Sequence, residues 1–269
     1  MSKMMSEDDI KKNFNLNLKA TEYYKLLNCL FRAKRKYFES SLSFIYDVLK
    51  SNRFKGNKLL EIGSGATVHN IASASAYFPI IVQSDFVEDN RKFLKMWLSG
   101  DLSLDWTDFL NLAAKLEKHE GDLDEVRQQL EFRIRNKVKA VVHCDILTDA
   151  VLQTEDLTPE SSPPYDLIIS ILCLEVPCLN FESFLSVLKR LNKLLRKGGG
   201  ILISSVLDTE CWEVEGKTFP HLKVDLKDIL LALDISGFGN HFVKYMSPKN
   251  PIYQELQFDY YCIASEKLQ

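Results

Sequence analysis

The strongest constraint on the fold is the alternation of short β-rich runs with helical patterns from residue 58 onward. A chain that alternates in this way is typical of an open α/β sheet with crossover helices. Three of the runs are continuously apolar, as expected for strands buried on both faces of a parallel sheet. The candidate strands, seven in all, cover residues 58–62, 80–85, 138–146, 165–174, 200–207, 242–247 and 258–265.

The end of the chain departs from this alternation. Only the segment PKNPIYQELQ separates the last two runs, so they are expected to form an antiparallel hairpin at one edge of the sheet. Before the fifth run, FESFLSVLKRLNKLLRKGGG has apolar residues at helical spacing, basic residues in its last turns and a glycine stop. We therefore predict an α/β fold whose seven-stranded, mostly parallel sheet ends in an antiparallel C-terminal hairpin, with helices on both faces.

Two helical segments lie outside the alternation. Residues 1–55 contain amphipathic helical patterns that precede the sheet. Residues 100–137 alternate acidic and basic side chains over helical spacing, which predicts a solvated helical insertion between the second and third strands. A chain of 269 residues, 46% of them hydrophobic, can bury a large core, and we expect one domain over residues 1–269.

Composition and charge exclude several classes of function. The net charge of −3 and the isoelectric point near 6.0 give no basic field for nucleic acid or anionic membranes, so the expected partner is a small molecule. The charged start and the lack of a long apolar stretch argue against a signal peptide or a membrane span and favour a cytoplasmic protein. Six scattered cysteines without a C-x-x-C pair, and five histidines without ligand spacing, favour reduced thiols and no metal site.

The loop EIGSGATVHN is the first candidate binding site. Gly63 and Gly65 follow the first strand, and their lack of a side chain lets a ligand approach the bare main chain. A dinucleotide-binding fingerprint needs a third glycine where this chain has Val68, and no Gly-Lys-Ser/Thr follows as in a P-loop. Glu61 instead completes an acidic-x-Gly-x-Gly pattern, which resembles motif I of S-adenosylmethionine-dependent methyltransferases, where the acidic residue meets the methionyl ammonium.

Acidic residues also end the next two predicted strands. Asp85 stands 22 residues after Gly63, at a position suited to accept both hydroxyls of a ribose, and this spacing is shared with NAD-binding proteins. Asp145 follows the third strand, where methyltransferases of this class bind the adenine amino group. Taken alone, Asp145 is more commonly a cap or a turn residue. In register with the loop and Asp85, it favours an adenosine site.

With these motifs in view, the chain resembles the family of nicotinamide, phenylethanolamine and indolethylamine N-methyltransferases, which also includes thioether S-methyltransferase. The resemblance implies a Rossmann-like class I methyltransferase fold, S-adenosyl-L-methionine as the cofactor, and an N-terminal helical lid formed by residues 1–55. It covers nearly the whole chain and rests on FNLNLKATEYYK, EIGSGATVHN, SDFVEDN followed by KMWLSGDLSLDW, HCDI, SILCLEVPC and LLRKGGGILISSVL.

The resemblance also implies the residues that hold the cofactor. They are Gly63, Ser64, Gly65 and Thr67 at its methionine end, Asp85, Phe86 and Asn90 around the ribose and adenosine, Asp145 and Ile146 at the adenine, Ile171 beside the sulfur, and Tyr23 and Tyr24 on the lid. Lys19 and His69 depart from the family, which usually has tyrosines at these two positions.

Two acidic residues are candidates for the acceptor side. Glu175, in CLEVP, matches the position at which the phenylethanolamine enzymes contact the substrate amine, and Asp208 matches a second acidic position. Carboxylates at the ends of neighbouring strands attract a cationic amine and accept its proton. The alternatives are a helix cap for Glu175 and an ordinary loop carboxylate for Asp208. Trp212 and Phe219 offer an aromatic wall or simple lid packing, and Glu255 is a third, weaker acidic candidate.

The expected function is S-adenosylmethionine-dependent N-methylation of a small amine, with an arylalkylamine favoured, by a monomeric cytoplasmic enzyme. Methyl transfer from a sulfonium is an in-line displacement that requires alignment and desolvation, and no metal or catalytic triad. Two alternatives stay open: the same chemistry on nicotinamide, another pyridine or a thioether, and an inactive cofactor-binding protein of the same fold. Val68 and the terminal hairpin disfavour a nicotinamide-dependent dehydrogenase.

Overall fold

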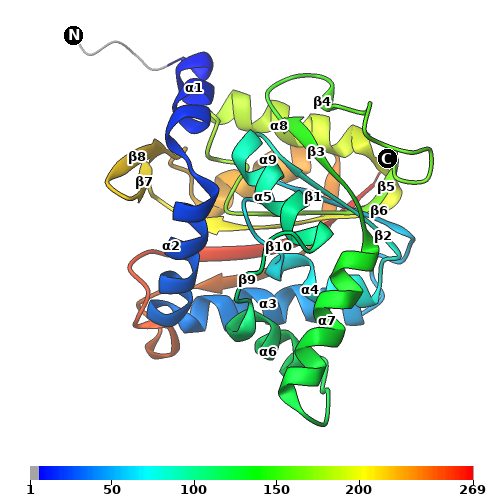
Figure 1. Cartoon of the computed structure of the whole chain (residues 1–269). Coiled ribbons are helices and arrows are strands. Elements are labelled where there is room, and N and C mark those ends of the chain that lie inside the picture. The colour runs from blue at the N-terminus through cyan, green and yellow to red at the C-terminus, as the bar shows by residue number, and fades with distance from the viewer. Residues whose placement is uncertain (1–5, 269) are drawn as a thin grey trace.

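The computed structural model describes residues 6–268, which fold around an eight-stranded sheet with helices on both faces (Figure 1). The strand order is β4-β3-β2-β1-β5-β6-β10-β9, and every neighbouring pair from β3 to β6 is parallel. The strands of this sheet are β1 (Lys58–Ile62), β2 (Ile80–Asp85), β3 (Val138–Asp145), β4 (Val151–Leu152), β5 (Tyr165–Ile171), β6 (Leu195–Val206), β9 (Phe238–Met246) and β10 (Tyr260–Lys267).

Nine α-helices are present among residues 6–268. They are α1 (Glu7–Asn17), α2 (Ala20–Ala33), α3 (Arg35–Lys50), α4 (His69–Ala72), α5 (Glu88–Ser99), α6 (Thr107–Leu116), α7 (Leu123–Lys137), α8 (Phe181–Leu194) and α9 (Leu226–Ile235). A separate two-stranded hairpin consists of β7 (Cys211–Val214) and β8 (Lys217–Pro220). None of the helices in this described part of the chain is both long and apolar enough to cross a membrane.

The predicted α/β fold is confirmed, and each of the seven predicted strands is present. The predicted antiparallel end is also confirmed, because β10 runs antiparallel to both β6 and β9, and β9 forms the sheet edge. Three short strands were missed. The two residues of β4 are too few to produce a periodic pattern, and β7 and β8 are short strands joined by a tight turn at Glu215 and Gly216, both with positive φ.

The sheet is buried on both faces, which explains the continuous apolar runs. In β1, Leu59 belongs to the core cluster under α3, α4, α6 and α7, whereas Leu60 belongs to the cluster under α8 and α9, and both side chains are fully buried. Successive residues of a strand point to opposite faces, so a strand covered on both sides needs apolar residues at every position.

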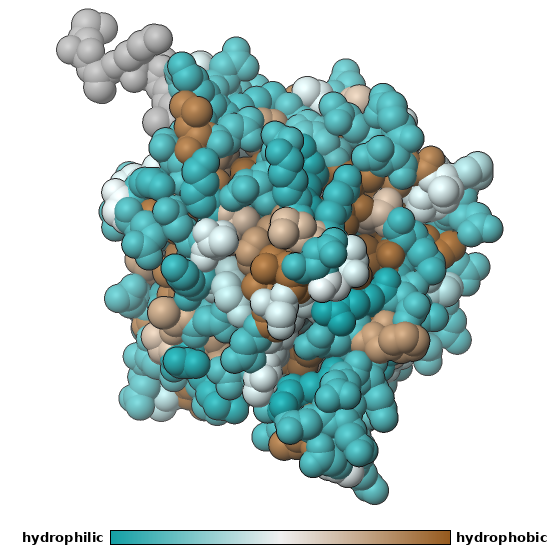
Figure 2. Space-filling view, viewed as in Figure 1, coloured by the Kyte–Doolittle hydropathy of each residue, from teal (hydrophilic) through white to brown (hydrophobic). Residues whose placement is uncertain are grey.

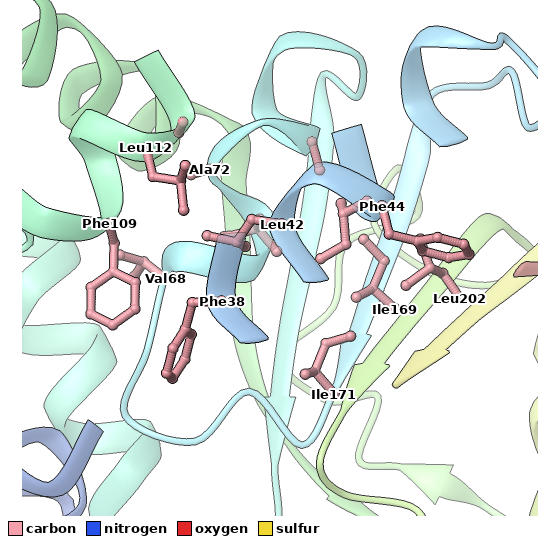
Figure 3. Packing of buried hydrophobic residues seen from close by; sticks show 14 of the residues in the cluster. Phe38, Leu42, Phe44, Val68, Ala72, Phe109, Leu112, Ile169, Ile171 and Leu202 are labelled. Carbon is pink, nitrogen blue, oxygen red and sulfur yellow. The ribbon is translucent and has the colours of Figure 1, made fainter. Parts of the chain in front are cut away.

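Helix α3 packs directly on the first of these two faces (Figure 3). Phe44 of this helix lies close to Ile169 of β5 and Leu202 of β6, whereas Phe38 lies on the side of Val68 and of Phe109 of α6. Although the resemblance implies a lid over residues 1–55, α3 is thus part of the core. Residues 1–5 of the predicted lid lie outside the described residues.

Helices α1 and α2 lie instead beside the β7–β8 hairpin (Figure 1). Asn13 of α1 donates its side-chain amide to the carbonyl of Thr218, 3.1 Å away. Lys217 forms an ion pair of 3.1 Å with Glu22 of α2. Phe14 and Phe219 pack with ring centroids 4.8 Å apart. These contacts join the two N-terminal helices and the hairpin into one cover, which we call the lid (α1, α2, β7 and β8).

The segment predicted to be a solvated insertion forms α6 and α7. Helix α6 is largely buried, since Phe109 and Leu110 are fully covered in the core, and α7 carries Ile134 into the same cluster before leading into β3. The charged residues of the segment predicted a solvated position, whereas the apolar residues between them decide the packing. Figure 2 shows that hydrophilic residues cover most of the face seen there, with smaller areas of apolar residues.

Candidate active site

Two neighbouring cavities lie between the lid and the ends of the parallel strands. The first contains about 760 Å³ of space, counting its opening, and we call it the loop cavity because the glycine loop forms its floor. Most of the residues predicted from the sequence for adenosine line it. Its walls include Lys11, Phe14 and Tyr23 from the lid, Gly63 and Gly65 from the loop, and Asp85, Phe86, Asn90, Cys144, Asp145 and Ile146 from the strand ends.

The glycine loop is shaped by two residues that no larger side chain can replace. Gly63 and Gly65 have φ values of +69° and +58°, in the left-handed region. A Cβ atom at Gly63 would lie 2.1 Å from the sulfur of Cys173, and one at Gly65 would lie 2.7 Å from the ring of Tyr23. The main chain is therefore bare on the side that faces the cavity, as close approach of a ligand requires.

Asp85 is fixed in position by three protein donors. Its carboxylate accepts hydrogen bonds from the backbone N–H of Gly65 at 2.7 Å, from that of Val87 at 2.8 Å, and from the Asn90 amide at 3.0 Å. Burial raises the pKa of Asp85 above its usual value, and the three hydrogen bonds oppose this shift. The side-chain oxygen of Asn90 is buried and has no hydrogen-bond partner within residues 6–268. The pair therefore offers oriented acceptors to the cavity.

Asp145 and Ile146 line the loop cavity next to Asp85. One oxygen of Asp145 accepts a hydrogen bond of 3.1 Å from the backbone N–H of Leu147, and the other forms an ion pair of 2.6 Å with Lys11 of α1. This ion pair links the lid to the far side of the cavity opening. No sequence pattern indicated Lys11, because its partner lies more than a hundred residues away.

The two predicted lid tyrosines have different environments. Tyr23 lines the loop cavity with its ring against Gly65, and burial raises the pKa of its hydroxyl well above the usual value. Tyr24 points away: its hydroxyl accepts from the backbone N–H of Asp105 at 2.8 Å, and its ring packs edge-on against Trp106. Tyr24 does not line the loop cavity, so its contact with the cofactor stays a prediction.

A small inner pocket continues from the loop cavity past Gly63 and Tyr23, and Ile171 lines it. Ser64, Thr67 and His69 line this pocket too, at the position predicted for the methionine end of the cofactor. The hydroxyl of Thr67 donates to the carbonyl of Ser64 at 2.8 Å, which holds the loop closed on itself. Burial lowers the pKa of His69 to about 3, so this imidazole is neutral near pH 7.

Glu61 lies beneath the loop and lines neither the loop cavity nor the inner pocket. Its carboxylate accepts hydrogen bonds from the Gln83 amide at 2.9 Å and the Asn70 amide at 3.3 Å. Burial raises the pKa of Glu61 to about 7. The acidic residue of the motif thus supports the loop from below.

The second cavity contains about 1160 Å³ of space, counting its opening, and we call it the hairpin cavity. It shares Tyr23, Leu172, Val176 and Trp212 with the loop cavity, so these four residues form a common wall. Leu172 has a φ of +55°, which is strained for a side chain of this size, and such strain is concentrated at functional sites in proteins. Other residues of this cavity are Leu26, Leu27, Leu30, Lys34, Tyr37, Phe38, Ser205, Thr209, Glu213, His221, Phe258 and Tyr260.

The predicted acceptor carboxylates do not line this cavity. Glu175 is only 1% exposed, and its carboxylate accepts a hydrogen bond from the hydroxyl of Tyr261. Asp208 is exposed, with a φ of +54°. Glu255 accepts a 2.6 Å hydrogen bond from the backbone N–H of Lys36, at the start of α3. Contacts of Glu175 and Asp208 with a substrate therefore stay predictions.

Phe219 and Trp212 lie within the lid, stacked with centroids 4.8 Å apart, and Trp212 also faces both cavities. No sequence pattern indicated His221, whose Nε2 lies 3.3 Å from the hydroxyl oxygen of Ser205, because the 16-residue separation of the two residues matches no periodicity of a helix or strand. The six cysteines are all free, and no cluster of His, Cys, Asp and Glu suited to a metal occurs between residues 6 and 268.

Comparison with known proteins connects this geometry to one family. The model of the NNMT/PNMT/TEMT family matches residues 2–267. Indolethylamine N-methyltransferase of Oryctolagus cuniculus is 28% identical over 211 residues, which are 78% of this chain and 76% of that protein. Nicotinamide N-methyltransferase of Homo sapiens is 26% identical over 243 residues, which are 90% and 88% of the two chains.

A solved structure supports the fold independently. Magnesium protoporphyrin IX methyltransferase from Synechocystis PCC 6803, with bound S-adenosylmethionine, superimposes with a TM-score of 0.54 at 10% identity. The superposition covers 98% of this chain and 99% of that one. At this identity, the likeness shows a shared Rossmann-like fold.

Proposed function

Because the chain belongs to the NNMT/PNMT/TEMT family, we propose that it methylates the nitrogen of an arylalkylamine in the hairpin cavity, using S-adenosylmethionine bound in the loop cavity. N-methylation of small-molecule amines with this cofactor follows from the family and its relatives. The finer step, the choice of an arylalkylamine, rests on one observation: an apolar, aromatic cavity shares a wall with the cavity that suits the cofactor.

The residues of the loop cavity fit S-adenosylmethionine. Gly63 and Gly65 leave bare main chain, Asp85 offers a buried carboxylate for the ribose hydroxyls, and the unpartnered oxygen of Asn90 is a further acceptor. Asp145 would accept from the adenine amino group, with Ile146 against the ring. When bound, the cofactor supplies a methyl group that is already activated as a sulfonium.

The protein's own contribution is alignment and removal of water. The common wall separates the two cavities by single side chains, so an amine that rests against Tyr23 and Leu172 lies next to the loop cavity. The lid forms walls of both cavities, since Phe14 lines the loop cavity, Trp212 lines both, and their rings pack with centroids 6.2 Å apart. A nucleophilic nitrogen held under such a cover loses its hydration shell before transfer.

The lining of the hairpin cavity supports an aromatic amine. Three leucines of α2 (Leu26, Leu27 and Leu30) line the cavity together with the aromatic rings of Phe258 and Tyr260, which suits a flat ring. The charged residues of the lining are Lys34 and Glu213, both near solvent. Glu175 and Asp208 remain proposed partners of the amine, on the basis of the resemblance of their positions.

An acceptor panel tests this proposal. Purified protein is incubated with radiolabelled S-adenosylmethionine and, in turn, phenylethylamines, indolethylamines, nicotinamide, simple pyridines and dialkyl thioethers. We expect transfer to the arylalkylamines with the highest kcat/KM. Preferential transfer to a pyridine or a thioether would contradict the acceptor class but not the family.

Calorimetry with S-adenosylhomocysteine separates the enzyme from an inactive relative. We expect binding in the micromolar range or tighter, roughly −8 kcal/mol. Binding without transfer to any acceptor of the panel would favour an inactive cofactor-binding protein. No binding at all would contradict the cofactor assignment itself.

We also propose that the protein acts as a single-domain monomer in the cytoplasm. The six free cysteines, two of them exposed, support a reducing compartment. Sedimentation at micromolar concentration should give the mass of one chain, and fractionation of the source cells should recover the protein with cytoplasmic markers.

A further inference from the structure

The geometry points to His221 as the group that takes the proton from the acceptor amine, through the hydroxyl of Ser205. This inference rests on the proposed function, because only an amine acceptor arrives with a proton to lose. Both residues line the hairpin cavity, and both are buried, with exposed fractions of 7% for His221 and 1% for Ser205.

The fold positions this pair from two directions. Ser205 stands near the end of β6, in the middle of the sheet, whereas His221 follows β8 directly and returns the chain from the lid to the sheet. The backbone N–H of His221 donates to the carbonyl of Glu210 at 2.9 Å, and that of Leu222 donates to the carbonyl of Glu175 at 3.1 Å. These two hydrogen bonds hold the backbone that carries the imidazole of His221 in place.

The surroundings of the ring determine which nitrogen carries the proton. Nδ1 of His221 faces two backbone carbonyl oxygens, that of Leu222 at 3.0 Å and that of Thr209 at 3.3 Å. A carbonyl oxygen only accepts, so Nδ1 must carry the hydrogen of the neutral ring. Nε2 then has a free lone pair, and it faces the hydroxyl oxygen of Ser205 at 3.3 Å. Ser205 donates to Nε2 and keeps its own lone pairs for a group in the cavity.

The chemistry of an arylalkylamine requires such a proton acceptor. At neutral pH an aliphatic amine is mainly an ammonium ion, whose nitrogen has no lone pair and cannot attack a methyl group. In the proposed step an N–H bond of the ammonium breaks and its electron pair stays on nitrogen. The proton passes to the oxygen of Ser205 while the serine proton passes to Nε2, which leaves a neutral amine and an imidazolium. The imidazolium later returns its proton to water.

The charged groups around the pair are compatible with this step. Glu213 of β7 lines the same cavity and favours the imidazolium, whereas Lys34 at the C-terminal end of α2 opposes it. The remaining titratable groups of the lining are Cys211 of β7, Tyr37 of α3, Tyr23 of α2 and Tyr260 of β10. The three tyrosines are neutral near pH 7, because burial raises the pKa of each hydroxyl above its usual value. No ion pair occupies His221 within the described residues, so its Nε2 is available to the cavity by way of Ser205.

A second histidine provides a matched control. His241 of β9 also contacts a serine, with Nδ1 2.8 Å from the hydroxyl oxygen of Ser265, but its Nε2 faces the carboxylate of Asp234 at 2.9 Å. It lines neither the loop cavity nor the hairpin cavity. His241→Gln therefore removes an imidazole from a serine without touching the proposed path.

The experiment compares wild type, His221→Gln and His241→Gln on arylalkylamines of graded basicity, made by fluorination next to the amine. For the most basic amine at pH 7 we expect H221Q to lower kcat/KM by about 100-fold, the smaller end of the usual range for general-base catalysis. For a fluorinated amine that is mostly neutral at pH 7, the loss should shrink to about threefold. Raising the pH should bring H221Q toward wild type on the basic amine, and H241Q should behave as wild type throughout.

Ser205→Ala is the second variant, and it should show the same dependence on amine basicity as H221Q. Calorimetry with S-adenosylhomocysteine should give wild-type affinity for all three variants, which shows that they are folded. A loss that is equal for all amines, or a loss with no rescue at high pH, would overturn the role of His221 and leave the proposed function intact. A wild-type enzyme that methylates pyridines and no amine would overturn both.

Discussion

The loop cavity and the hairpin cavity share a wall but are built in different ways. In the loop cavity the polar groups are fixed by the main chain: Asp85 accepts from the backbone of Gly65 and Val87, and the glycines themselves form the floor. In the hairpin cavity the lining comes from side chains of α2, α3, β6, β7 and the segment before β10. The sheet side of the first cavity is therefore rigid and suited to one invariant ligand, whereas the second, apart from the common wall, takes its shape from residues that can be exchanged singly.

The largest expected effect concerns the loop cavity. Asp85→Ala removes the acceptor for three buried donors, each of which costs about 1–3 kcal/mol when left unpaired. That cost lowers the stability of the fold; because the ribose hydroxyls also lose their proposed carboxylate acceptor, we expect the affinity for S-adenosylhomocysteine to fall by at least about 1000-fold, equivalent to roughly 4 kcal/mol. Calorimetry measures the affinity, and thermal unfolding measures the accompanying loss of stability.

Asp101→Ala is the matched control for this change, because Asp101 is an exposed aspartate whose carboxylate accepts from the hydroxyl of Ser99, away from both cavities. It should bind S-adenosylhomocysteine as wild type does. If D85A kept an affinity within about tenfold of wild type, Asp85 would not make the expected contribution to cofactor binding.

The burial of Glu61 beneath the glycine loop has an electrostatic cost, which makes the free energy of unfolding depend on pH. Because burial raises the pKa of Glu61 to about 7, the folded protein keeps a proton between about pH 4.5 and 7 that the unfolded chain has lost. The free energy of unfolding then falls as pH rises through this window, by up to about 3 kcal/mol. Glu61→Gln removes this dependence, so its stability relative to wild type should increase by up to that amount between about pH 4.5 and 7.5 in urea titrations.

His69 serves as a control, because its contribution to the free energy of unfolding changes with pH in the opposite direction. Burial lowers the pKa of His69 to about 3, so its contribution to stability is present above about pH 6.5 and is lost as pH falls toward 3. His69→Gln should therefore gain stability relative to wild type as pH falls, the reverse of E61Q. Parallel curves for E61Q and wild type at all pH values would show that the loop tolerates an ionised Glu61 without penalty.

Glu175→Ala tests the buried carboxylate that the resemblance implies for the acceptor amine. We expect turnover with the best amine to fall by about 30-fold, roughly 2 kcal/mol, while the affinity for S-adenosylhomocysteine changes by less than about threefold. Steady-state kinetics and calorimetry separate the two quantities.

Tyr261→Phe is the control for that change, since it removes the hydroxyl that donates to Glu175 and keeps the carboxylate. Y261F should retain most of the turnover. Unchanged turnover in E175A would remove Glu175 from the mechanism. Equal losses in E175A and Y261F would assign it a structural role beneath the cavity.

The smallest effect is expected at the opening of the loop cavity. The Lys11–Asp145 ion pair is partly exposed, at 25% and 16% for the two side chains, so its contribution is about 1 kcal/mol or less. Lys11→Met should weaken S-adenosylhomocysteine binding about threefold at low salt, and the difference should vanish near about 0.5 M salt. Lys12→Met changes the exposed neighbour and should have no effect; a persistent difference at high salt would assign Lys11 a contact other than the ion pair.

The sequence predicts the residues of the loop cavity well for a physical reason. Its polar residues on the sheet side follow the ends of strands, and the ends of parallel strands meet at one edge, so the strand pattern alone predicts that Gly63, Asp85 and Asp145 converge. No comparable rule predicts which residues line the hairpin cavity. His221 and Ser205 meet only because β8 returns the chain to the sheet, and the direction in which Tyr23 and Tyr24 point depends on the packing of α2, which periodicity alone does not give.

Tyr23 lines the loop cavity, the inner pocket and the hairpin cavity at once, as does Leu172. For protein engineering this makes the two positions poor targets, because any exchange that reshapes the acceptor site also alters the cofactor site. Libraries aimed at new acceptors should hold both fixed and vary Leu30, Thr209 and Phe258, which line the hairpin cavity and not the loop cavity. Substrate range could then change by small steps while the cofactor requirement is inherited unchanged.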